Sequence, residues 1–350
     1  MRKLRKRGEE IRQFILSRLS SQTAEVPTAT AEKFKISRQA VNKHFQKLVD
    51  GGALIARGKT RRKTYELAPV LEWTQAYPIS PALAEDEVWR EDIAPRFGEI
   101  PDNVKKIWQY GFTEMFNNAV DHSNGREITV SIKRTAHETR ILIQDDGIGI
   151  FKKIQTYLGL TNQRHAILEL AKGKFTTDPK RHSGEGIFFT SRVFDRFSIS
   201  SGELFFAHDL NDHQDWMIES NYPASGTLIL MTLNNHTART TKHIMDQFAV
   251  GDDFGFDKTI VPVRLAKLGE DNLISRSQAK RLLTRIDRFK TVVFDFKDVK
   301  IIGQAFADEI FRVFASEHPE ISIQEFEANA EVCQMITRAR NLRRAESGNS

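Results

Sequence analysis

The stretch FTEMFNNAVDHS, residues 112–123, decides the fold of the central part of this chain. Its apolar residues recur at about 100° per residue, so they share one stripe and predict a helix with a buried face. The opposite side carries acidic and short polar side chains and neither Lys nor Arg. A helix that faces only water normally shows both charge signs, so this polar face indicates a ligand. An ordinary amphipathic helix is the alternative interpretation.

The polar face has two side chains that can reach one ligand. Glu114 and Asn118 lie one helical turn apart, which places a carboxylate next to an amide. His122 continues the same row and either lines a site or makes an ordinary hydrogen bond at the helix end. Asp121 is expected at the surface.

Three glycine-containing motifs follow in order. In TRILIQDDGIGI, residues 139–150, alternating apolar residues run into Asp145, and two glycines come after it. Such a carboxylate can accept from an amine while the backbone passes close to a flat ring. RHSGEGIFFTSRVFD, residues 181–195, opens a helix with two glycines, whose backbone N–H groups suit phosphate. SGTLILMTL, residues 225–233, enters a strand through Thr227.

The ordered set of motifs resembles the GHKL ATPase superfamily. This superfamily includes gyrase B subunits, heat-shock chaperones, mismatch-repair proteins, sensor histidine kinases and anti-sigma-factor kinases. The resemblance covers roughly residues 96–235. It implies an α/β sandwich of the Bergerat type that binds ATP with Mg2+.

The resemblance also implies a role for each motif residue. Glu114 matches the position that orients or deprotonates the attacking water in hydrolytic members. Asn118 matches the magnesium ligand, whose oxygen suits a hard cation. Asp145 matches the residue that accepts from the adenine amino group, with Thr227 beside it. The remaining implied nucleotide contacts come from the glycine motifs and from an expected mobile lid between them: Gly147, Gly149, Gly184, Gly186, Lys172, Lys174 and His182.

Positive charge is concentrated near the N-terminus. Residues 1–70 contain 17 Lys and Arg against six Asp and Glu, a balance of +11 in a chain whose net charge is +6. A basic unit of this kind indicates binding to a polyanion. The sequence has no apolar run of about 18 residues and no signal core, and its single cysteine is Cys333. We therefore expect a cytoplasmic protein with no membrane span, no internal disulfide and no all-cysteine metal site.

The basic unit resembles a winged helix-turn-helix. Two helices precede a third over residues 38–50, which begins after the N-cap Ser37 and ends at Gly51. Two short strands follow, ALIAR and KTYEL, joined by the basic turn GKTRR. The resemblance implies that the third helix reads base edges and that the turn contacts phosphates. The residues in these roles are Arg38, Gln39, Asn42 and Lys43 in the helix, and Lys59, Arg61 and Arg62 in the turn.

The C-terminal segment alternates strands and helices from about residue 256, which predicts a small open α/β domain. The stretch VVFDF…IIGQAFADEIF resembles STAS-like domains, the fold of anti-sigma-factor antagonists. Phosphorylated members carry Ser or Thr in the loop before the helix, whereas this loop reads IIGQ, residues 301–304. The sequence therefore favours packing or binding of a protein partner over a phosphorylation switch.

Together these patterns predict a multidomain α+β protein. The predicted parts are a winged helix at residues 1–70, a linker at 71–95, a GHKL domain at 96–236, a connector at 237–268 and a STAS-like domain at 269–345. For the winged helix, docking of a protein in place of DNA is the alternative.

Three functions are compatible with this organisation. The first is a regulator that binds double-stranded DNA and uses Mg-ATP binding, with hydrolysis left open, to control DNA or partner binding. The second is a serine/threonine protein kinase of the anti-sigma-factor type that acts on a STAS partner. The third is a clamp that forms a homodimer on nucleotide. A sensor histidine kinase is disfavoured because no histidine occurs from residue 45 to 121.

Overall fold

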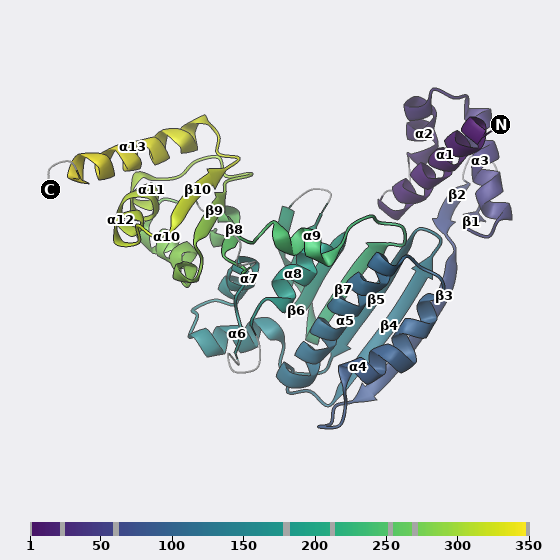
Figure 1. Ribbon diagram of the computed structural model, residues 1–350, viewed down its shortest axis with the longest axis horizontal. Coiled ribbons are helices and arrows are strands. Elements are labelled where there is room, and N and C mark those ends of the chain that lie inside the picture. Colours follow the sequence, from purple (N-terminus) through teal and green to yellow (C-terminus); the bar gives the residue numbers. More distant parts are fainter. Residues whose placement is uncertain are drawn as a thin grey trace.

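The computed structural model describes residues 2–21, 25–58, 63–177, 183–210, 214–250, 255–267 and 272–347. Figure 1 shows a helical N-terminal unit and a C-terminal unit at opposite ends of a central unit that is built on a sheet. None of the helices in the described ranges combines the length and the apolar character that a bilayer crossing requires.

The N-terminal unit has three helices followed by an antiparallel strand pair, as the sequence predicts. Its elements are α1 (Arg2–Ser21), α2 (Val26–Phe34), α3 (Arg38–Asp50), β1 (Leu54–Arg57) and β2 (Thr64–Leu67). The N-cap Ser37 accepts a hydrogen bond from the Ala40 N–H at 3.2 Å, and Gly51 follows the last residue of α3. The buried residues of α3 are Val41, Phe45 and Leu48. They belong to a core separate from that of the other two units.

The central unit is an antiparallel sheet with strand order β3-β4-β5-β7-β6. Its strands are β3 (Pro69–Pro78), β4 (Glu127–Thr135), β5 (Glu138–Asp145), β6 (Arg196–Asp209) and β7 (Gln214–Asn234). Its helices are α4 (Glu85–Val88), α5 (Asp102–His122), α6 (Ile150–Leu158), α7 (Arg164–Lys172), α8 (Gly186–Val193) and α9 (Thr241–Asp246), and helical turns at Trp89–Ile93 and Ala94–Phe97 continue α4. Figure 1 shows α5 lying across the sheet. Phe112, Met115 and Phe116 are fully buried there, so the predicted core stripe of this helix is confirmed.

The segment predicted as a linker, residues 71–95, is instead part of the central unit. Strand β3 pairs antiparallel with β4, with Trp73 opposite Ile132. Leu71, Trp73 and Tyr77 pack against the core, while prolines stand at both ends of the strand. Proline is tolerated in an edge strand because an N–H that would face solvent has no ladder partner to lose. The prediction failed because the partner strand is distant in sequence and the apolar alternation is short.

The C-terminal unit is a parallel sheet with strand order β10-β9-β8 and helices packed around it. Its elements are β8 (Lys258–Pro262), the turn Val263–Ala266, α10 (Arg276–Leu283), the turn Ile286–Arg288, β9 (Thr291–Asp295), α11 (Gln304–Asp308), the π-helical segment Glu309–Phe314, α12 (Ala315–Glu317), β10 (Ser322–Phe326) and α13 (Ala330–Ser347). Strand β8 lies inside the predicted connector, 237–268, so the unit begins earlier than predicted. It shares one continuous hydrophobic core with the central unit.

The N-terminal unit contacts the central unit through the end of α1. The Ser20 hydroxyl donates to the carboxylate of Glu138, which is 4% exposed. Arg196 donates both to the Ser20 hydroxyl at 3.1 Å and to the same Glu138 carboxylate at 3.0 Å. Because Glu138 and Arg196 lie on β5 and β6, this contact joins α1 directly to the central sheet.

Candidate functional site

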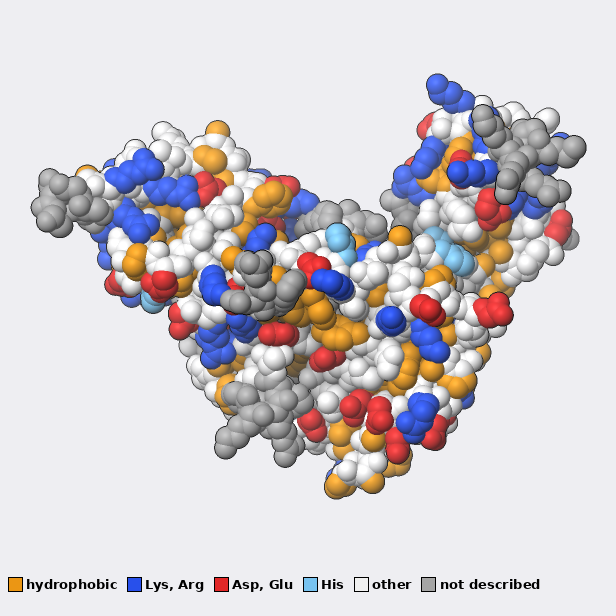
Figure 2. All heavy atoms as spheres, in the orientation of Figure 1, with side chains coloured by type: hydrophobic (Ala, Val, Ile, Leu, Met, Phe, Trp, Pro, Cys, Tyr) orange, Lys and Arg blue, Asp and Glu red, His pale blue; other side chains and the backbone are white. Residues whose placement is uncertain are grey.

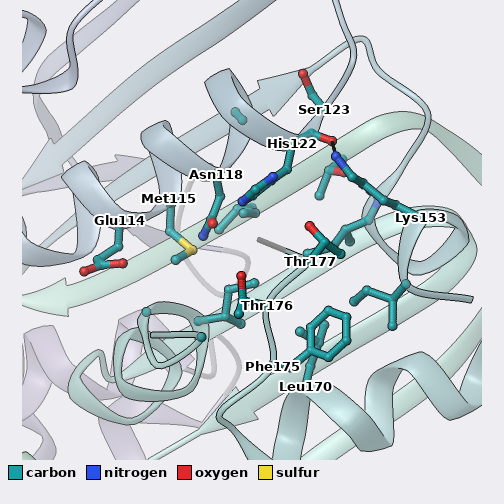
Figure 3. A pocket seen from close by; sticks show the side chains of 18 of the residues that line it. Glu114, Met115, Asn118, His122, Ser123, Lys153, Leu170, Phe175, Thr176 and Thr177 are labelled. Carbon is teal, nitrogen blue, oxygen red and sulfur yellow. Dashed lines mark hydrogen bonds between the residues drawn. The ribbon is translucent and has the colours of Figure 1, made fainter. Parts of the chain in front are cut away.

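A cavity of about 240 Å3 lies on the helix-covered side of the central sheet, between α5, α6, α7, the start of α8 and strands β5 and β7. Figure 3 shows Glu114, Asn118 and His122 projecting from α5 along one wall of this pocket. The structure brings together residues from all four sequence motifs. The predicted site residues that line the pocket are Glu114, Asn118, Asp145, Gly184, Gly186 and Thr227.

Asp145 stands at the end of β5 with its side chain 5% exposed. Its Oδ1 accepts from the backbone N–H of Gly147 at 2.9 Å and from that of Thr227 at 3.2 Å. The Thr227 hydroxyl in turn accepts from the Ile150 N–H at 3.0 Å. Burial raises the pKa of Asp145. A carboxylate has about four acceptor positions, so Asp145 can still accept from a ligand amine.

The glycines after Asp145 allow the chain to pass close to its neighbours. A Cβ on Gly147 would lie 2.1 Å from the backbone oxygen of Ser123 at the end of α5. Gly149 has φ +86°, and a Cβ there would lie 2.5 Å from the Ser201 hydroxyl. Both glycines therefore lie behind the Asp145 end of the pocket, and neither lines it.

The adjacent Asp146 bonds to the protein backbone and does not line the pocket. Its Oδ1 accepts from the backbone N–H groups of Arg126 at 2.6 Å and Glu127 at 3.1 Å. These hydrogen bonds hold the pKa of Asp146 below its usual value. Asp146 thus fastens the loop to the start of β4, which leaves Asp145 as the carboxylate that faces the pocket.

Glu114 points at the first turn of α8. A Cβ on Gly186 would lie 2.0 Å from Oε2 of Glu114, so only glycine leaves room for this carboxylate. A helix N-terminus stabilises negative charge. The sequence predicts phosphate at this N-terminus, whereas in the structure the Glu114 carboxylate lies there. Tyr110 lies on α5, one turn before Glu114. Burial and the charges of Glu114 and Glu185 raise the pKa of Tyr110, so its hydroxyl stays protonated.

The donor set of the pocket fits Mg2+ and ATP. Asn118 offers an amide oxygen, which is a ligand that Mg2+ accepts together with phosphate oxygens. Asp145 offers a buried acceptor for an amine. When bound, the cation would offset the charge of the triphosphate.

The prediction that Lys172 contacts phosphate is wrong. Its side chain is 1% exposed and its Nζ donates to Oε1 of Glu169 at 2.6 Å. Nζ also donates to the backbone oxygens of Arg281 at 3.1 Å and Thr284 at 2.8 Å, both in the C-terminal unit. An ammonium group has three N–H donors, and all three are used away from the pocket.

Lys174 is directed away from the pocket as well. Its Nζ donates to the backbone oxygen of Arg288 at 2.9 Å and lies 3.6 Å from the carboxylate of Asp257. This lysine therefore contacts the C-terminal unit, and its predicted phosphate contact is corrected. His182 lies outside the described residues.

Other pocket residues were missed by the sequence analysis. Lys153 of α6 lines the pocket, where Nζ donates to the backbone oxygen of His122 at 2.5 Å and to Oδ1 of Asn124 at 3.3 Å. Burial lowers the pKa of Lys153. Among the described lining residues it is the only Lys or Arg. The segment predicted to form a lid contributes hydroxyl groups from Thr176, Thr177 and Ser183. The signals were the position of Lys153 one turn after Gly149 and the Thr-Thr pair within the predicted lid.

Two segments of the chain match known protein families, and one of these segments contains most of the pocket residues. Residues 105–232 match the family described as histidine kinase-, DNA gyrase B-, and HSP90-like ATPase. Residues 278–332 match a STAS-like domain of unknown function (DUF4325). A search of curated proteins found no match to the chain.

The chain therefore carries a GHKL-type ATPase domain, and the resemblance inferred from the ordered motifs is confirmed. A domain of this class binds ATP, typically with Mg2+, and points to a regulatory role. More particularly, the same chain also contains a C-terminal STAS-like domain.

Proposed function

We propose that this protein is a regulator that binds double-stranded DNA through its N-terminal unit and uses Mg-ATP in the GHKL domain to control that binding. The observation that carries the proposal is the polar face of α3, whose residues are exposed on the basic N-terminal unit. These residues are Arg38, Gln39, Asn42 and Lys43. Figure 2 shows Lys and Arg side chains over the N-terminal unit.

The side chains on α3 have the chemistry of base readout. Gln39 and Asn42 carry amides, which can donate to and accept from adenine in the major groove. Arg38 and Lys43 can donate hydrogen bonds to guanine. The basic turn between β1 and β2, residues 59–62, lies outside the described residues, and its phosphate contacts stay a prediction from sequence.

Removing charge from that turn is expected to weaken DNA binding without changing its sequence preference. Changing Arg61 and Arg62 together to Ala should reduce the affinity for every duplex. It should also reduce the slope of log affinity against log salt by about 2 units, because binding releases counterions only at phosphates that the protein contacts. Fluorescence anisotropy at several salt concentrations measures both effects. Changing Asn42 alone should alter sequence preference.

A matched control removes two exposed lysines from the central unit. Lys105→Ala combined with Lys106→Ala, at the start of α5, should leave the affinity and the salt slope unchanged. If the unaltered protein shifts no duplex at low salt, the N-terminal unit is a protein-docking module and the proposal is wrong.

Nucleotide is expected to change DNA affinity. The contact of Ser20 with Glu138 and Arg196 provides a physical link between α1 and the nucleotide-binding sheet. A coupling of about 1–3 kcal/mol corresponds to about 5- to 150-fold in affinity. The measurement is a DNA titration with and without a non-hydrolysable ATP analogue at fixed salt. Reciprocity requires that DNA change the affinity for the analogue by the same factor.

The control for this coupling is a protein with reduced nucleotide affinity. At an analogue concentration that saturates only the unaltered protein, Asp145→Ala should bind DNA nearly as the nucleotide-free protein does. Equal DNA affinities with and without analogue in the unaltered protein would mean that the two units act independently.

A protein kinase is the second candidate, because the ATPase domain and a STAS-like domain occur in one chain. Incubation with ATP labelled on the γ-phosphate separates the candidates. Free labelled phosphate indicates an ATPase, label on protein indicates a kinase, and neither product indicates a protein that only binds ATP.

A further inference from the structure

The segment that follows α6 and borders the nucleotide pocket is attached to the C-terminal unit. In Figure 1, α7 lies between α6 and the C-terminal unit. All its residues from His165 to Lys172 are buried. Its C-terminal end passes through Gly173 into Phe175, Thr176 and Thr177, which line the pocket.

Lys172 forms the first link across this boundary. Two of its three hydrogen bonds go to the backbone oxygens of Arg281 and Thr284, at the end of α10. The last carbonyl groups of a helix lack partners within the helix, and a cation there is favourable. Lys172 therefore caps α10 from another unit of the protein. The Lys172 backbone oxygen also accepts from the Thr259 hydroxyl of β8 at 2.7 Å.

Arg285 forms the second link, and it reaches the pocket wall. Its Nη1 donates to Oε2 of Glu169 at 3.0 Å, and its Nη2 donates to the backbone oxygen of Lys174. The guanidinium group also lies over the ring of Phe175, 4.9 Å from the ring centre. The Phe175 N–H donates to the backbone oxygen of Gly184 at 3.1 Å. Arg285 thus contacts a pocket-lining residue directly and a second one, Gly184, through it.

The junction also depends on close backbone packing. Gly173 has φ +83°, and a Cβ there would lie 2.6 Å from the ring of Phe256. The Arg288 side chain donates to the backbone oxygen of Lys174 at 3.1 Å, and the Arg288 backbone oxygen accepts from Nζ of Lys174 at 2.9 Å. These contacts fix the backbone of residues 173 and 174, immediately before the pocket-lining residues.

A buried ion pair stabilises only the geometry in which its hydrogen bonds are complete. Glu169 and Lys172 are 3% and 1% exposed, so their charges are removed from water. The cost of removing charge from water is offset here by partners in the C-terminal unit, namely Arg285 and the two carbonyl groups of α10. The docked arrangement of the two units therefore determines where residues 173–177 lie.

We propose that Arg285 is a positioning residue for the nucleotide pocket, and that docking of the STAS-like unit sets nucleotide affinity. The proposal rests on the ATP site described above. Docking orders Phe175, Thr176 and Thr177 before ATP arrives, so ATP binding does not have to order them. By reciprocity, ATP stabilises the docked state.

The test measures binding of a non-hydrolysable ATP analogue with Mg2+ by calorimetry on the full chain. Arg285→Ala should weaken affinity by roughly 10-fold, within the usual range for coupled sites. Arg285→Lys should restore part of this loss, because it keeps the charge without the planar fork. The matched control is Arg340→Ala, which removes a two-bond ion pair with Glu325 inside the C-terminal unit. This control should bind the analogue like the unaltered protein.

Hydrogen exchange on the unaltered protein gives a second readout that needs no variant. Addition of the analogue should slow amide exchange in residues 276–288, although these residues do not line the pocket. Exchange there that is unchanged by bound analogue overturns the proposal, as does an Arg285→Ala protein that binds the analogue normally. If the unaltered protein binds no analogue, the ATP-site assignment fails and this inference fails with it.

Discussion

Glu114→Gln is expected to lower the rate of ATP turnover by about 10²- to 10⁴-fold, the contribution usual for a general base. The variant keeps the shape of the side chain and its place against Gly186, but the amide cannot accept a proton. Nucleotide affinity should stay close to that of the unaltered protein, because Glu114 lies at the α8 end of the pocket, away from Asp145, the residue expected to accept from adenine. The release of labelled γ-phosphate, measured beside calorimetric affinity, separates the two effects.

Asp121→Asn is the matched control for this experiment. It makes the same chemical change on the same helix, at an exposed position that does not line the pocket. Its turnover should equal that of the unaltered protein. Equal turnover in Glu114→Gln would mean that Glu114 has no catalytic role. If the unaltered protein transfers label to protein, the kinase is the correct alternative.

The motif residues of the nucleotide pocket could be predicted because each depends on local backbone geometry. A carboxylate at a strand end with glycines behind it has a recognisable pattern, and Asp145, Gly147 and Gly149 occupy the places that this pattern requires. Glu114 and Asn118 lie on one helical face for the same local reason. The order of these motifs along the chain then indicates one superfamily of ATPases.

The parts that sequence could not predict depend on distant partners. The carbonyl groups that accept from Lys172 lie 109 and 112 residues away in the chain, so the local sequence does not reveal them. Without these partners in view, a lysine near a glycine motif is predicted to bind phosphate. The sequence of β3 predicts a linker, because its edge pairing with β4 is visible only in three dimensions. In both cases the side chains are ordinary for their position, and long-range packing decides their role.

Asp145→Asn is expected to weaken nucleotide binding by about 5- to 150-fold while preserving or raising the stability of the nucleotide-free protein. Burial raises the pKa of Asp145 in the folded state, so the folded protein holds the proton more tightly than the unfolded chain does. The ionised carboxylate therefore costs stability increasingly as pH rises through that raised pKa, and this cost is present at neutral pH. An amide carries no charge and avoids the cost.

The amide would still accept from the N–H groups of Gly147 and Thr227 through its single oxygen. Its NH2 group would then face the adenine amine, and two donors repel each other. We expect a loss of about 1–3 kcal/mol in binding, or about 5- to 150-fold in affinity. The increase in melting temperature that nucleotide produces should shrink accordingly.

Asp145→Ala and Asn118→Ala separate the ligand role of the pocket from its structural role. Asp145→Ala leaves two buried N–H groups without their acceptor, so it should lose nucleotide affinity and also about 1–3 kcal/mol of folding stability. Asn118→Ala should weaken binding in the presence of Mg2+ and have little effect when the metal is chelated. Calorimetry and thermal unfolding of all three variants provide the measurement. Unchanged nucleotide affinity in both Asp145→Asn and Asn118→Ala would mean that ATP does not bind in this pocket. An Asp145→Asn protein as unstable as Asp145→Ala would show that the buried charge itself supports the fold.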